Sequence, residues 1–100
     1  MAYSAYLNTG NSFGITFKSN ELPIDHTLIT KLQLFFTSNL ILSSAVYPDC
    51  FDFTEGEVKV YVGRSDIIPV GNYKVQAKVF DSDHPDGEVW GLPISIVVKE

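Results

Sequence analysis

Four carboxylates and one histidine are concentrated between residues 81 and 88, which read DSDHPDGE. Carboxylate oxygens are the ligands that calcium prefers, and a histidine beside a carboxylate can serve as a general base. Asp81, Asp83 and Asp86, followed by Gly87, have nearly the spacing that opens an EF-hand loop. This segment is therefore the first candidate for a metal or catalytic site.

The full spacing excludes an EF-hand. Pro85 occupies the position of the third aspartate, and Leu92 stands where the loop requires a bidentate glutamate. The sequence Pro85-Asp86-Gly87 is instead typical of a turn, because proline presets φ, aspartate bonds to the backbone and glycine accepts positive φ. We expect a structural turn at Asp86 and Gly87, with no bound metal.

An irregular calcium site remains the alternative for the same loop. Its oxygen ligands would come from Asp81, Asp83, Asp86 and Glu88.

Other reactive side chains lack the sequence context that catalysis requires. His26 and His84 each lie in a polar turn beside an aspartate, where we expect an exposed imidazole. The chain has no nucleophile elbow, phosphate-binding glycine loop or zinc-protease motif. Cys50 is the only cysteine, so an intramolecular disulfide is excluded and we expect a small buried side chain. We therefore predict no enzymatic activity and no cofactor.

Size and charge restrict the partners. A chain of 100 residues with 45% hydrophobic content fits one folded domain with one core. Its net charge of −5 disfavours nucleic acid and anionic membranes, and no apolar stretch reaches the length of a membrane span. The first ten residues lack the pattern of a secretory signal.

Apolar residues alternate with polar ones along the chain, which predicts an all-β fold. The alternation is clearest in residues 28–37, 57–63 and 72–80, where Leu28 is expected on the buried face of the first strand. Further short strands are predicted at 13–18, 40–47, 50–53 and 93–99, separated by turn sequences. About seven antiparallel strands at this spacing favour a single β-sandwich over residues 13–100.

Residues 1–12 are predicted to be a flexible N-terminal arm. They are rich in Asn, Ser, Thr and Gly, yet they contain Tyr3, Tyr6 and Leu7. These three side chains could contact a partner, with ordinary fraying as the other interpretation. The strand at 13–18 is the first candidate for an open sheet edge, because one lysine protects it.

The aromatic residues suggest a second possible function. A carbohydrate-binding module stacks sugars on exposed rings, and Trp90, Tyr61 and Tyr47 are the candidates. Rings in a chain this short more often belong to the core, so we treat sugar binding as the alternative.

Residues 66–98 resemble the immunoglobulin-like β-sandwich domains of tailed-bacteriophage virion proteins, among them baseplate proteins of lactococcal siphophages. The resemblance is carried by DIIPVGNYKVQAKVFD and the acidic turn after it, in which the matching residues are Asp66, Gly71, Tyr73, Asp81 and Gly87. It departs from antibody domains because no cysteine pair bridges the sheets.

The resemblance implies a structural or accessory virion protein, whether of the capsid, neck, tail or baseplate. Such a protein contacts other virion proteins and its own copies, and it is synthesised in the host cytoplasm. Gly71 is expected to take positive φ, and the Tyr73 ring is expected to be buried with its hydroxyl bonded to the preceding loop.

Overall fold

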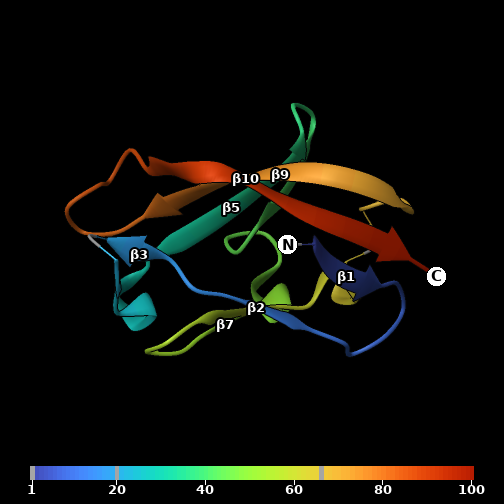
Figure 1. Ribbon diagram of the computed structural model, residues 1–100, viewed down its shortest axis with the longest axis horizontal. Helices are drawn as coiled ribbons and strands as arrows, with labels where there is room; N and C mark the ends of the chain where they lie inside the picture. Colours follow the sequence, from blue (N-terminus) through green and yellow to red (C-terminus); the bar gives the residue numbers. More distant parts are fainter. Residues whose placement is uncertain (1, 20, 66) are drawn as a thin grey trace.

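Two facing β-sheets form the protein in a computed structural model that describes residues 2–19, 21–65 and 67–100. Sheet A has five strands in the order β1-β10-β9-β5-β6, and sheet B has three in the order β2-β8-β7. In Figure 1, β5, β9 and β10 lie in the upper layer and β2 and β7 in the lower one. The strands of sheet A are β1 (Ala2–Tyr6), β5 (Lys31–Thr37), β6 (Leu40–Ser43), β9 (Gly71–Phe80) and β10 (Glu88–Lys99). Those of sheet B are β2 (Phe13–Ile15), β7 (Phe51–Phe53) and β8 (Val58–Val60).

Short elements join the two sheets. β3 (Lys18–Ser19) and β4 (Leu22–Pro23) form a separate two-stranded hairpin. Three 3₁₀ turns follow in chain order, η1 (His26–Leu28), η2 (Pro48–Cys50) and η3 (Val62–Arg64). In the described part of the chain no helix is long and apolar enough to cross a membrane.

The strand order confirms an all-β, immunoglobulin-like sandwich. Sheet B has the strand order B-E-D of an immunoglobulin domain, with β2, β8 and β7 in these places. Sheet A has the facing order G-F-C-C′, with β10, β9, β5 and β6 in these places. The inward residues of the long strands alternate as predicted, and they form one core between the sheets. Its fully buried side chains include Leu32, Leu34, Leu42, Val58, Val60, Val75, Val79, Ile96 and Val98.

The N-terminal segment is an edge strand over Ala2–Tyr6, which corrects the prediction of a flexible arm there. β1 runs parallel to β10, with Ala2 opposite Ser95 and Tyr6 opposite Lys99. Ala5 is buried, and the Tyr3 ring stacks on Phe13 with 4.9 Å between centroids. Deleting residues 1–12 would therefore remove a strand of sheet A. β1 lies before the predicted antiparallel strands and adds a parallel strand to the free edge of β10.

Leu28 is the other clear correction. It was expected on the buried face of a strand beginning at that residue, but it ends η1 and its side chain is 68% exposed. The strand begins only at Lys31, because the Asp25 carboxylate caps the preceding turn by accepting hydrogen bonds from the Thr27 backbone and hydroxyl. Similarly, β8 ends at Val60, and Val62 and Gly63 belong to η3.

Candidate binding surface

The acidic loop between β9 and β10 uses its first aspartate to organise itself. Asp81 Oδ1 accepts hydrogen bonds from the backbone N–H groups of Asp83 and His84 at 3.0 and 2.8 Å. His84 Nδ1 donates to the same oxygen at 2.9 Å, and His84 Nε2 lies 3.2 Å from Glu88 Oε2. Bonding to Asp81 raises the pKa of His84, and the same bond lowers the pKa of the Asp81 carboxyl.

This arrangement favours a turn at residues 81–88. Gly87 has φ of +85°, so the chain reverses through a backbone conformation that glycine accepts most readily. A Cβ there would lie 2.8 Å from the Phe80 ring and 2.6 Å from Lys78 Cε. Among the described residues no group of three histidine, cysteine, aspartate or glutamate side chains could hold a metal ion. Within that loop, backbone and imidazole donors occupy Asp81 Oδ1.

His26 is buried, which corrects the expectation of an exposed imidazole. Its exposed fraction is 0%, and Nε2 accepts a 2.9 Å hydrogen bond from the Phe17 backbone N–H. Nδ1 lies 3.1 Å from the Glu55 carbonyl oxygen, so the geometry requires a proton on Nδ1. The ring thereby connects η1 to two other segments and has a structural role.

The corner before β9 contains the tyrosine arrangement that the resemblance implies. Tyr73 donates its hydroxyl proton to the Pro69 carbonyl at 2.8 Å, and its ring meets Phe36 edge-on at 5.3 Å. Gly71, however, does not take positive φ; it begins β9 and lies under the Tyr73 ring. A Cβ at Gly71 would lie 3.4 Å from that ring, which is close to ordinary van der Waals contact. Asp66 lies outside the described residues.

The candidate sugar-stacking rings do not form a common platform. Trp90 packs edge-on against Phe17 at 5.4 Å, and its indole N–H is buried without a hydrogen-bond partner in the described part of the chain. Tyr61 lies under the Arg64 guanidinium, 3.9 Å from the ring centroid. Tyr47 is partly buried against the core. Each ring is thus engaged by a neighbouring side chain.

The candidate partner contacts at the N-terminus are divided between two faces. Tyr3 and Leu7 are partly buried against the core, whereas Tyr6 lies opposite Lys99 on the outer face of sheet A. The Lys99 ammonium lies 5.8 Å from the Tyr6 ring centroid.

The outer face of sheet A carries most of the positive charge of the protein. Register places Lys78 beside Gln33 and Val89, and it places Lys74 beside Ser95. With Lys31 and Lys99, four of the seven basic residues project from this face. The only carboxylate in the strands of sheet A is Glu88, which lies opposite Val79 on the inner face. We call the outward residues of these strands the lysine face.

Apolar side chains lie among these lysines. Phe35 and Ile41 are opposite one another on β5 and β6, and both are only partly buried. Val89 is 60% exposed, and Val97 is partly exposed beside Asn72. Aromatic residues such as Phe35 are enriched in protein interfaces, whereas lysines are depleted there. A contact on this face would therefore use its lysines through charge complementarity with the partner.

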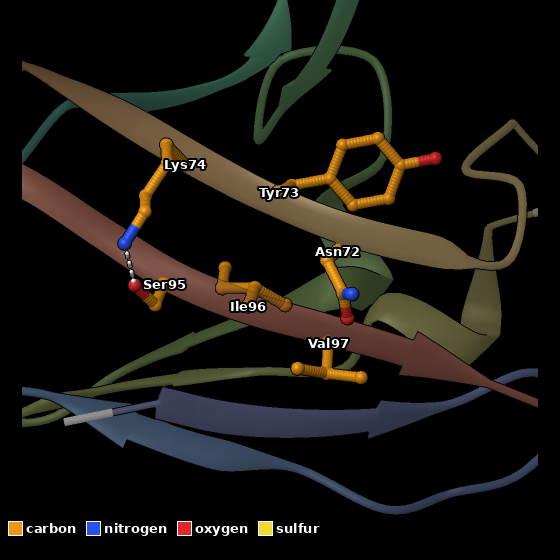
Figure 2. A pocket seen from close by; sticks show the side chains of 6 residues that line it. All are labelled: Asn72, Tyr73, Lys74, Ser95, Ile96 and Val97. Carbon is orange, nitrogen blue, oxygen red and sulfur yellow. Dashed lines mark hydrogen bonds between the residues drawn. The ribbon is translucent and has the colours of Figure 1, made fainter.

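A shallow hollow of about 140 Å³ interrupts the lysine face between β9 and β10. Figure 2 shows Lys74 reaching across to Ser95, with the Tyr73 ring directed to the other side of β9. The Lys74 ammonium donates a 2.9 Å hydrogen bond to the Ser95 hydroxyl. Asn72 and Val97 complete the side of the hollow nearer the C-terminus (Figure 2).

The lysine face could be anticipated only in part from the sequence. Lys31 and Lys78 occupy outward positions of their predicted strands, but nothing in the sequence specifies that these strands are neighbours. In the comparisons with known proteins, no family model, curated protein or solved structure matches the chain.

Proposed function

We propose that the chain is a structural or accessory component of a tailed-bacteriophage virion that acts through protein–protein contacts and has no enzymatic activity. The observation that carries the contact role is the lysine face, where Phe35 and Ile41 are partly exposed on the same face as the lysines. Buried apolar side chains surrounded by polar groups are the usual anatomy of a protein interface.

The assignment to a virion rests on the resemblance of residues 66–98 to phage immunoglobulin-like domains. The sandwich topology and the bond from Tyr73 to Pro69 are compatible with that resemblance. Both features occur in sandwiches of many functions, so fold alone does not select the role.

Quantitative mass spectrometry of purified particles tests this proposal. Tailed phage particles from cells that express this chain would be separated on a density gradient. Peptides of the chain would then be measured in each fraction. We expect a constant ratio to the major capsid protein across the particle peak, with an abundant host cytoplasmic enzyme as the negative control. Absence of the chain from the particle peak would contradict the proposal.

Carbohydrate or host-surface binding is the second candidate function. Its candidate site is the hollow in Figure 2, where polar groups of Asn72, Lys74 and Ser95 lie beside the apolar Val97 side chain. A glycan array distinguishes the two: the structural role predicts no specific binder. A saturable glycan whose binding is lost in Asn72→Ala but retained in the distant Asn39→Ala would favour the alternative.

A further inference from the structure

The charges of this protein are segregated between two regions. The lysine face contains four cations, whereas the rest of the chain has twelve carboxylates and only three basic residues. Carboxylates concentrate beyond the end of β9, at Asp81, Asp83, Asp86 and Glu88, and Asp25 shares a hollow of about 380 Å³ with part of this group. We call these five residues the acidic end.

The chain does not neutralise its own lysine face. In the part of the chain that the structure describes, none of the four ammonium groups lies within ion-pair distance of a carboxylate. Lys31 and Lys78 contact the Phe80 ring at 4.1 and 5.3 Å from its centroid, and Lys74 bonds to Ser95. These contacts are all to uncharged groups.

Distance separates Lys74 and Lys99 from the acidic end of their own copy, whereas Lys31 and Lys78 lie beside that end, next to Phe80 and Gly87. Lys74 lies six residues before Phe80 on β9, which corresponds to about 20 Å along a strand. This exceeds the screening length of about 8 Å at physiological ionic strength. A second copy can bring its acidic end to Lys74 directly.

We propose that the lysine face of one copy binds the acidic end of a second copy in a head-to-tail contact. The apolar groups are complementary as well: Phe35 and Ile41 lie on one surface, and the exposed Leu28 lines the hollow at the other. A contact between two different surfaces repeats from copy to copy, so it produces a ring where the rotation closes and a filament where it does not. The inference rests on the proposed protein-contact function and names its partner.

Charge reversal on each surface tests this contact. Lys74→Glu with Lys99→Glu changes the lysine face, and Asp83→Lys with Asp86→Lys changes the acidic end; all four side chains are exposed. Lys18→Glu with Lys59→Glu has the same formal charge change as the first pair but lies outside sheet A, and serves as the matched control. Circular dichroism and melting temperature establish that each variant is folded.

Sedimentation velocity over a concentration series is the measurement. We expect the wild type and the control to self-associate at about 0.01 M salt and to dissociate at about 1 M, as the screening length falls from about 30 to about 3 Å. Each charge-reversed variant should self-associate more weakly, on the order of tenfold or more. Mixed together, the two variants should associate in alternation. The intact acidic end of the first fits the intact lysine face of the second, and the new basic end of the second fits the new acidic face of the first.

Three outcomes would overturn the inference: a wild type that is monomeric at both salt concentrations, self-association that neither variant weakens, or a mixture of the two variants that stays monomeric. Particle incorporation is measured separately. If the chain is found in particles but does not self-associate, this inference fails and the proposed function stands. If the chain self-associates but is absent from particles, the proposed function fails and the contact stands.

Discussion

The hydroxyl of Tyr73 donates a 2.8 Å hydrogen bond to the carbonyl oxygen of Pro69, four residues earlier in the chain. This bond joins the start of β9 to the loop that crosses from sheet B. Tyr73→Phe should lower the free energy of unfolding by about 1 kcal/mol, because the ring packing on Phe36 remains and only the bond is lost. Urea denaturation measures the change, with Tyr61→Phe as the control. Equal effects of the two substitutions would contradict a special role for the Tyr73 hydroxyl.

His26 should be among the most sensitive positions outside the apolar core. His26→Ala leaves the Phe17 N–H and the Glu55 carbonyl without their partners and creates a cavity, so we expect a loss of about 3 kcal/mol. His84→Ala at the exposed histidine is the control for calorimetry. Nitrogen NMR should find the proton of the neutral ring on Nδ1; a proton on Nε2 would contradict the hydrogen bond from Phe17.

Gly87 combines positive φ with close contacts to Phe80 and Lys78. Gly87→Ala should therefore destabilise the protein by about 1 to 3 kcal/mol. Gly56→Ala is the matched control, because Gly56 has open space around it and no positive φ. If both substitutions leave the unfolding midpoint unchanged, the loop does not require glycine.

The hydrogen-bonded pair of His84 and Asp81 should make the stability of the fold depend on pH. The stability that the pair contributes should be lost both at high pH, through His84, and at low pH, through Asp81. The pKa of His84 is raised by Asp81, so its contribution is present below about pH 6.5 and is lost as the pH rises through the raised pKa. The pKa of Asp81 is lowered by His84, so its contribution is present above about pH 4 and is lost as the pH falls through the lowered pKa. The difference in melting temperature between wild type and His84→Gln should be greatest between these limits. A difference that is constant from pH 3 to 9 would contradict the coupling.

Cys50 should be unreactive in the folded protein. Its side chain is 1% exposed, and burial raises the pKa of the thiol, so little thiolate is available. Ellman's reagent should label it only after urea is added, when one equivalent reacts. Rapid labelling without urea would show that η2 opens readily.

The inward and outward faces of β5 and β9 could be predicted from the sequence alone. Alternation along residues 31–37 and 72–80 assigns inward and outward side chains correctly, because burial on one face of a pleated strand requires a period of two. The Gly87 turn and the burial of Cys50 could be predicted as well, since these depend on backbone freedom and side-chain chemistry near the residue itself.

Which surfaces these faces build depends on strand pairing between distant segments, which the sequence pattern does not specify. Lys31 and Lys78 become one surface because β5 pairs with β9, a contact between distant segments that no local pattern encodes. The burial of His26 and the pairing of Ala2–Tyr6 with β10 have the same origin, because a polar turn or terminus is ordered by whichever distant backbone groups reach it. Local periodicity specifies what each strand can bury, and the packing of the sheets specifies what remains available for a partner.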